Sequence, residues 1–172
     1  MIINNVKLVL ENEVVSGSLE VQNGEIRAFA ESQSRLPEAM DGEGGWLLPG
    51  LIELHTDNLD KFITPRPKVD WPAHSAMSSH DALMVASGIT TVLDAVAIGD
   101  VRDGGDRLEN LEKMINAIEE TQKRGVNRAE HRLHLRCELP HHTTLPLFEK
   151  LVQREPVTLV SLMDHSPGQR QF

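Results

Sequence analysis

Hydrophobic and polar positions alternate over short segments in the first 30 residues, a pattern typical of β-strands. It predicts strands over Val6–Leu10 and Val14–Val21. Asn23-Gly24 then separates the segments SLEVQ and EIRAFA, and this dipeptide favours a two-residue hairpin turn because both of its residues adopt positive φ. Residues 31–45 are polar and glycine-rich. We therefore expect a small antiparallel sheet followed by a connector.

From Trp46 onward, apolar strands alternate with amphipathic helices. The pattern predicts four strands. The first ends in Leu51-Ile52-Glu53-Leu54-His55-Thr56-Asp57, and the others occupy residues 89–96, 132–139 and 157–165. A long loop is expected over Asn58–Met77. Helices are expected from Ser78, with Asp81 as its capping partner, to Gly88, from a capping box of Asp106 and Glu109 to Gly125, and from Thr144 to Pro156. This alternation indicates β/α units and a parallel sheet.

A β/α barrel has eight strands and typically about 250 residues, whereas this pattern supplies four strands. The expected fold is therefore α/β, the first half of a TIM-like barrel preceded by a piece of antiparallel β-sandwich. The expected domains are 1–45 and 46–172, the second of them incomplete.

Glu53, His55 and Asp57 share one face of their strand if its side chains alternate strictly. An imidazole and a carboxylate two residues apart can reach one cation, although such a pair is also common as a surface or strand-end feature. Taken alone, the pair leaves both interpretations open.

The strand over residues 132–139 has two contrasting faces: Leu133, Leu135, Cys137 and Leu139 on one side, and His134, Arg136 and Glu138 on the other. His165 ends the last strand. Because the carboxyl ends of parallel barrel strands meet at one edge, we expect four side chains to converge on one or two divalent metal ions: His55, Asp57, Glu138 and His165. In the alternative interpretation, Glu138 pairs with Arg136 and His165 caps a turn. Cys137 is expected to pack in the core, and His131 and His134 are expected to be structural.

The composition narrows the class of partner. The net charge is −9, tyrosine is absent and aromatic residues make up 3%, which argues against nucleic-acid and anionic-membrane binding. The single cysteine excludes an intrachain disulfide, and the start of the chain lacks the features of a signal peptide, so we expect a cytoplasmic protein.

The stretch WLLPGLIELHTD, following an N-terminal hairpin, resembles the opening of the amidohydrolase superfamily. That superfamily combines a metal-dependent β/α barrel with a small β-sandwich built from both chain ends. The usual motif at the end of the first barrel strand in that superfamily is His-x-His. This chain has His55-x-Asp57 instead, a departure that a narrower group of the superfamily shares. The segments TPRP, DWPAHSAM, GDVRDGGDR and SLMDHSPGQRQF resemble the diphosphatase family of the carbon–phosphorus lyase pathway.

This resemblance implies hydrolysis of a ribose 5-triphosphate to the 5-phosphate and diphosphate in phosphonate breakdown. It implies one or two divalent metal ions, with zinc the expected one, at the four positions given above. The expected partner is a small phosphorylated ribose substrate, and a homo-oligomer is compatible with the resemblance. Cationic and imidazole side chains that follow the strands are expected to contact substrate: Lys61, Arg66, Lys68, His80, His141 and His142. In the alternative interpretation, the basic loop is only solvated and His141-His142 are exposed loop residues.

The catalytic base is not identified and is expected beyond Phe172, which makes this chain an N-terminal part expected to be inactive alone. Two alternatives stay open. One is a C–N hydrolase of the cyclic amidase type, and the other is a non-catalytic half-barrel that needs a partner chain.

Overall fold

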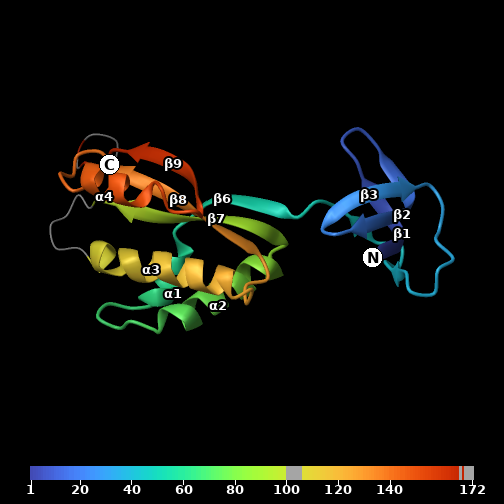
Figure 1. Ribbon diagram of the computed structural model, residues 1–172, viewed down its shortest axis with the longest axis horizontal. Helices are drawn as coiled ribbons and strands as arrows, with labels where there is room; N and C mark the ends of the chain where they lie inside the picture. The colour runs from blue at the N-terminus through green and yellow to red at the C-terminus, as the bar shows by residue number, and fades with distance from the viewer. Residues whose placement is uncertain (100–105, 167, 169–172) are drawn as a thin grey trace. The chain divides into compact units, whose positions relative to one another are not determined.

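The computed structural model describes residues 1–99, 106–166 and 168 (Figure 1). The chain divides into two compact units, Met1–Pro49 and Gly50–Phe172. Each unit has its own sheet and its own core.

The first unit is a five-stranded sheet with the order β3-β2-β1-β4, in which β5 also pairs with β1. Its strands are β1 (Ile2–Val9), β2 (Val14–Gln22), β3 (Glu25–Ala30), β4 (Met40–Asp41) and β5 (Trp46–Leu47). The predicted hairpin is confirmed, because Asn23 and Gly24 both have positive φ, 54° and 78°, between the antiparallel strands β2 and β3. Trp46 and Leu47 pair with β1, so the first unit continues to Pro49.

The second unit is a parallel four-stranded sheet with helices between its strands, as predicted. The strands are β6 (Leu51–Thr56), β7 (Ile89–Ile98), β8 (Glu130–Glu138) and β9 (Val157–Met163), in the order β6-β7-β8-β9. The helices are α1 (Asn58–Ile63), α2 (Ala73–Ala86), α3 (Asp106–Lys123) and α4 (Thr144–Leu151). This curled sheet has the order and connectivity of one side of a β/α barrel.

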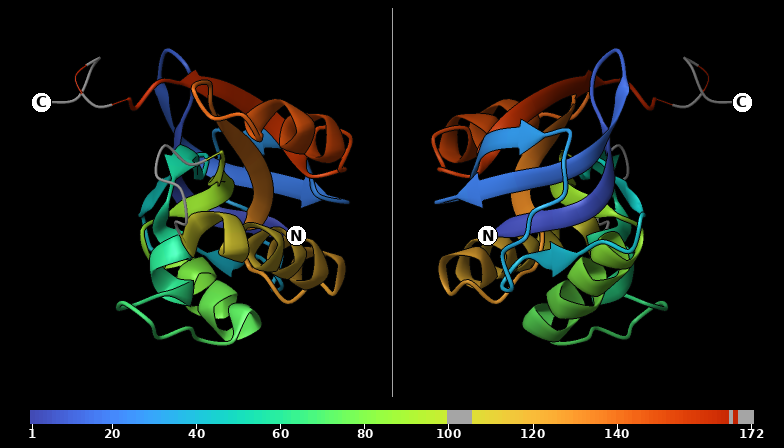
Figure 2. Two further views of the ribbon diagram at one scale, coloured as in Figure 1. Left: turned by 90° about the vertical axis from the view of Figure 1, so that its left-hand side faces the viewer. Right: turned by 90° about the vertical axis from the view of Figure 1, so that its right-hand side faces the viewer.

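The main core lies on the face of this sheet that the helices cover, which we call the outer face. Leu133, Leu135 and Cys137 of β8 point into it, as the alternation predicted, and Ile115 and Ile118 of α3 pack against them with no exposed surface. Figures 1 and 2 show α1, α2 and α3 gathered on one side of the strands. The opposite, inner face therefore carries the other half of each strand's side chains.

Two predicted boundaries are wrong. The segment after the first barrel strand begins with helix α1 rather than a long loop, and α2 begins at Ala73 rather than at Ser78. Pro72 precedes α2 with φ −55°, so its fixed backbone can start the helix without a side-chain cap. Asp81 is buried and accepts the backbone N–H groups of Arg128 and Ala129, so it is not a capping partner of Ser78. The predicted Asp106–Glu109 capping box lies outside the described side chains.

Apolar side chains lie exposed on the outermost strands of the second unit. On β6, Leu51, Ile52 and Leu54 are about 60% exposed, and Leu162 of β9 is 67% exposed. Each of these strands has one neighbour in the sheet formed by the described residues. In the described part of the chain, no helix has the length and apolar character needed to cross a membrane.

Candidate functional site

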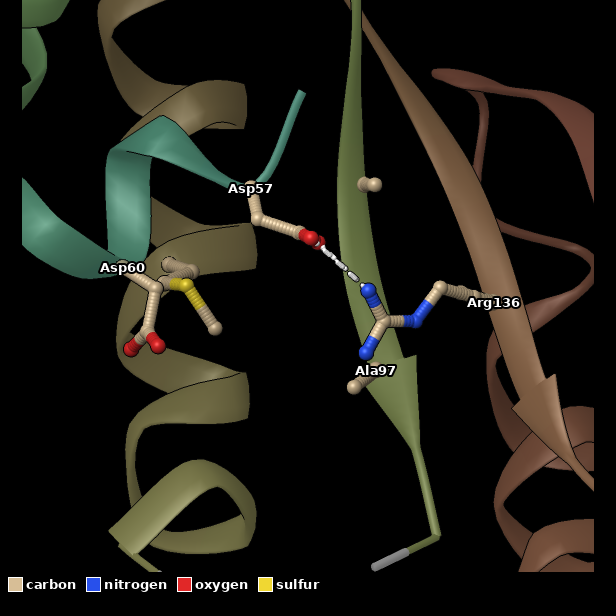
Figure 3. A pocket seen from close by; sticks show the side chains of 6 residues that line it. Asp57, Asp60, Ala97 and Arg136 are labelled. Atoms are coloured by element: carbon tan, nitrogen blue, oxygen red, sulfur yellow. Dashed lines mark hydrogen bonds and ion pairs between the residues drawn. The ribbon is translucent and has the colours of Figure 1, made fainter. Parts of the chain in front are cut away.

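Charged side chains from β6, β8 and β9 meet near the carboxyl ends of these strands. Arg136 of β8 reaches across β7, and its Nη1 donates hydrogen bonds to both carboxylate oxygens of Asp57, each at 2.8 Å (Figure 3). The Nε atom of Arg136 lies 3.7 Å from Oε1 of Glu138 on the same strand. One guanidinium thus lies between two of the predicted metal ligands.

Glu138 has a second partner in His165, whose Nδ1 is 2.6 Å from Glu138 Oε1. The Glu138 side chain is only 4% exposed, and its other oxygen, Oε2, is buried without a hydrogen-bond partner among the described residues. A buried carboxylate oxygen without a donor or cation is costly, so this atom indicates a missing positive partner.

His55 and Asp57 complete the group. His55 Nε2 lies 3.8 Å from Asp57 Oδ2, too far for a hydrogen bond. Two ligand atoms on one tetrahedral zinc ion lie roughly 3.4 Å apart, so this gap suits a shared cation better than a direct contact. His134 packs edge-on against His55 with ring centroids 4.9 Å apart, and burial together with the neighbouring His55 lowers the pKa of His134.

The structure therefore links the four predicted ligands through Arg136 without gathering them around one point. We call His55, Asp57, Arg136, Glu138 and His165 the strand-end cluster. Two imidazoles and two carboxylates are a donor set that suits zinc and similar divalent ions. Sequence reasoning considered Arg136 only as a partner of Glu138. The signal that could have found its role is the polar alternation of β8.

The pairing of β6 with β7 shifts register between Glu53 and Thr56. The strict alternation that was expected to place Glu53, His55 and Asp57 on one face is interrupted there. Glu53 instead accepts the backbone N–H of His55 at 2.9 Å, so it supports the strand next to this predicted ligand.

A small pocket adjoins the cluster, lined by Asp57, Asp60, Ala95, Ala97, Met114 and Arg136 (Figure 3). Ala95 and Ala97 are the inner-face residues of β7 that pair with His134 and Arg136. Their short side chains leave the space through which Arg136 reaches Asp57.

The predicted substrate-binding residues fall in three places. Lys61 on α1 and Arg66 and Lys68 in the following loop are exposed. His141 and His142 follow β8 directly, with ring centroids 4.6 Å apart, and the backbone N–H of His141 bonds to the carbonyl of Glu138. These two histidines thus lie beside the strand-end cluster.

The loop that carries these histidines also packs against the end of β7. Gly99 has φ +80°, and a Cβ atom there would lie 3.0 Å from Cβ of His141 and 2.1 Å from Oγ1 of Thr144. Glycine at position 99 therefore allows the close approach of the two strand ends.

His80 does not lie with the others, and its predicted contact with substrate is not supported by its position. It is fully buried on α2, where its Nε2 is 2.6 Å from Oδ1 of Asp94 on β7. The other oxygen of Asp94 is 2.7 Å from Nδ1 of His131, whose Nε2 is 3.3 Å from Oδ1 of Asp81. We call His80, Asp81, Asp94 and His131 the outer cluster, because Asp94 and His131 alternate with the inner-face residues of their strands.

The outer cluster is held by charge as well as by hydrogen bonds. Burial opposes ionisation of Asp94, but the hydrogen bonds and charges of His131 and His80 outweigh it and lower the pKa of Asp94. Burial likewise opposes the charged form of His131, but Asp94 and Asp81 outweigh it and raise the pKa of His131. Because carboxylates accept and do not donate, both ring nitrogens of His131 donate, and this imidazolium lies between two buried acids.

His80, Asp94 and His131 also form a group of three metal-capable residues with ligand atoms within 4.8 Å of one another. In this structure each of these histidines already makes a short hydrogen bond to Asp94, and His80 Nδ1 is buried without a hydrogen-bond partner among the described residues. The described residues thus offer two candidate positions for a metal ion, on opposite faces of one sheet.

Comparison with solved structures identifies the fold as one shared with larger chains. A crystal structure of atrazine chlorohydrolase TrzN from Arthrobacter aurescens TC1, complexed with zinc, matches 95% of this chain and 46% of its own with a TM-score of 0.52 and 14% identity. An uncharacterized protein matches 83% of this chain and 34% of its own with a TM-score of 0.51 and 15% identity. At these identities the likeness concerns the fold alone. No protein-family model matches the chain.

One particular relative is far more similar. The chain is 99% identical over all 172 residues to the alpha-D-ribose 1-methylphosphonate 5-triphosphate diphosphatase of Escherichia coli strain K12. It spans 46% of the length of that protein. The resemblance predicted from the sequence motifs is thereby confirmed.

Proposed function

We propose that this chain carries part of the active site of a metal-dependent hydrolase that converts alpha-D-ribose 1-methylphosphonate 5-triphosphate to the 5-phosphate and diphosphate. The near-identical E. coli relative bears the name of that activity. The single structural observation that supports it most is Glu138 Oε2, a buried carboxylate oxygen at a strand end that has no partner among the described residues. An acid in that position is expected to bind a cation.

His55, Asp57, Glu138 and His165 are proposed to hold one or two divalent ions, with zinc the first choice for a set of imidazole and carboxylate ligands. A bound ion supplies a water molecule of lowered pKa and stabilises charge that develops on phosphoryl oxygens. The roles of the chain's own residues follow from their contacts. Arg136 holds the Asp57 carboxylate, and His134 packs against His55 and keeps its ring in place.

The triphosphate is proposed to lie over the strand ends, where cationic side chains offset its charge. His141 and His142 are the nearest candidates, because their loop is bonded to the backbone of Glu138. Lys61, Arg66 and Lys68 are exposed candidates from the loop region after β6. Arg66 is the best suited to a bidentate phosphate contact. The proposed setting is the cytoplasm, where the free thiol of Cys137 would stay reduced.

Phosphorus NMR on a full-length protein that carries this segment tests the proposal. Incubation with the ribose triphosphate and zinc should give diphosphate and the 5-phosphate, and His55→Ala should abolish both signals. If the phosphorus spectrum does not change while a cyclic amide substrate is opened, the function is C–N hydrolysis and the proposal is wrong.

The outer cluster is the second candidate metal position, favoured by the 4.8 Å grouping of its ligand atoms. Counting the zinc equivalents bound by His55→Ala and by a His131 variant distinguishes the two. Loss of an equivalent in the His55 variant alone supports the strand-end cluster.

A further inference from the structure

Arg136 is a buried cation in a place where a metal-dependent site would not need one. Its side chain is 8% exposed, yet it lies between two acids that are proposed metal ligands. A guanidinium so close to a divalent ion opposes the binding of that ion by charge repulsion. Its presence therefore calls for a specific role.

The geometry of the Asp57 contact suggests that role. One guanidinium nitrogen lies 2.8 Å from both Oδ1 and Oδ2, so it sits between the two oxygens on one side of the carboxylate. A carboxylate offers about four acceptor positions, so those on its far side stay available. Oδ2 is the oxygen 3.8 Å from His55 Nε2. Arg136 thus holds Asp57 with one oxygen directed at the neighbouring imidazole.

Without Arg136, little would hold Asp57 in this orientation. The Asp57 side chain is 44% exposed, and it precedes α1 without making a side-chain capping bond to that helix. A carboxylate with so few restraints would rotate and meet water instead of a metal ion.

We infer that Arg136 is a positioning residue for the metal site: it fixes Asp57 so that Asp57 and His55 can bind the same ion. The inference rests on the proposed function, because it requires a metal at the strand-end cluster. Hydrogen-bond partners of metal ligands typically contribute about 10–100-fold to metal affinity, which sets the expected effect.

The zinc affinity of a metal-stripped, full-length protein carrying this segment, measured by competition with a chromophoric chelator, tests the inference. Arg136→Gln should bind zinc about 10–100-fold more weakly than the parent. Arg136→Lys keeps the charge but loses the planar fork, so its affinity should fall between the two. Arg132→Gln is the matched control, since Arg132 is on the same strand, is 44% exposed and bonds only Glu130 among the described residues.

A second readout separates positioning from general stability. The visible spectrum of the cobalt-loaded protein reports the ligand geometry, and it should change in Arg136→Lys and stay unchanged in Arg132→Gln. Circular dichroism and urea midpoints show which variants are folded. If Arg136→Gln does not fold, Arg136→Lys and its cobalt spectrum decide the question.

Zinc affinity within about threefold of the parent in a folded Arg136→Gln, or parental affinity and cobalt spectrum in Arg136→Lys, overturns the inference. The failure of the proposed function gives a different result. If the parent binds no zinc, or His55→Ala binds it equally well, the metal site itself is absent and both proposals fall. If His55→Ala loses zinc while Arg136 variants keep it, only the role of Arg136 is wrong.

Discussion

The two faces of one parallel sheet carry two clusters of histidine and carboxylate side chains that differ in how completely they are paired. In the outer cluster, both oxygens of Asp94 and both nitrogens of His131 have partners within 3.3 Å, and His80 Nδ1 is buried without a partner among the described residues. All four residues are at most 1% exposed. In the strand-end cluster, Glu138 Oε2 and Arg136 Nε are buried without hydrogen-bond partners among the described residues. The carboxylates are fully paired on the outer face, whereas Glu138 keeps a buried oxygen without a partner at the strand ends.

This difference in pairing distinguishes a structural cluster from a candidate metal site more clearly than the types of residue do. A buried network is stabilising only when its members are satisfied, and unsatisfied members call for another explanation, such as a missing ion or water. The outer cluster ties α2 to β7 and β8, and both of its carboxylates are satisfied without a ligand. The strand-end cluster lies at the edge where barrel enzymes bind their substrates, and it is incomplete.

The largest expected effect is on turnover, from Glu138→Gln in the full-length protein. This change keeps the shape of the side chain and removes the charge proposed to hold a metal. Loss of about 4 kcal/mol of transition-state stabilisation corresponds to a rate about 10³-fold lower, measured by phosphorus NMR of diphosphate release.

Glu130→Gln is the control for that change, since Glu130 is on the same strand, is about half exposed and pairs with Arg132. It should retain turnover within about twofold. Equal losses in both variants, or none in Glu138→Gln, would remove the functional distinction between the two clusters.

The next largest effect is on stability, from His131→Phe. An aromatic ring is kept, but Asp94 and Asp81 each lose the donor that His131 supplies and stay buried, so the free energy of unfolding should fall by about 3 kcal/mol in urea titrations at pH 6. The number of zinc ions bound should not change. His74→Gln on α2, where the histidine is 50% exposed and pairs with Glu120, should cost less than about 0.5 kcal/mol.

One result would reverse the assignment of the two clusters. If His131→Phe loses one equivalent of zinc and keeps its urea midpoint, the outer cluster is the metal site.

The stability difference between the parent and His131→Phe should depend on pH. The pKa of His131 is raised above its ordinary value of 6.5, so its contribution is fully present below that pH and is lost as pH rises through the folded-state pKa. Each unit of pKa difference between the folded and unfolded states is worth about 1.4 kcal/mol. The difference in unfolding free energy should therefore be smaller at pH 9 than at pH 5.5. A constant or growing difference would mean that His131 is not charged in the folded protein.

Much of the fold could be predicted because local patterns and the final packing agree. The hairpin at Asn23-Gly24 and the alternation of β8 each follow from the residues themselves. The start of α2 could not be predicted from Ser78, because the buried position of Asp81 depends on the distant backbone of residues 128 and 129. Tertiary contacts there override a local capping signal.

The candidate site shows the same division. Glu138 and His165 were placed at the ends of neighbouring strands by the sequence pattern, and the structure brings them within 2.6 Å of each other. The burial of His80 could not be predicted, because it depends on which side of α2 faces the sheet. The bond from Arg136 to Asp57 joins residues 79 positions apart, and it passes through the space that the short side chains of Ala95 and Ala97 leave.

The smallest expected effect comes from Cys137→Ser, next to Glu138 but on the outer face of β8. Burial, together with the neighbouring Glu138, raises the pKa of this thiol, so it is a poor nucleophile and belongs to the packing side of the comparison. A buried hydroxyl in an apolar core should cost about 1–2 kcal/mol of unfolding free energy, while turnover stays within about twofold. Urea titration and the diphosphate assay on the same preparation measure both. A large loss of turnover with unchanged stability would mean that the two faces of β8 do not divide packing from chemistry.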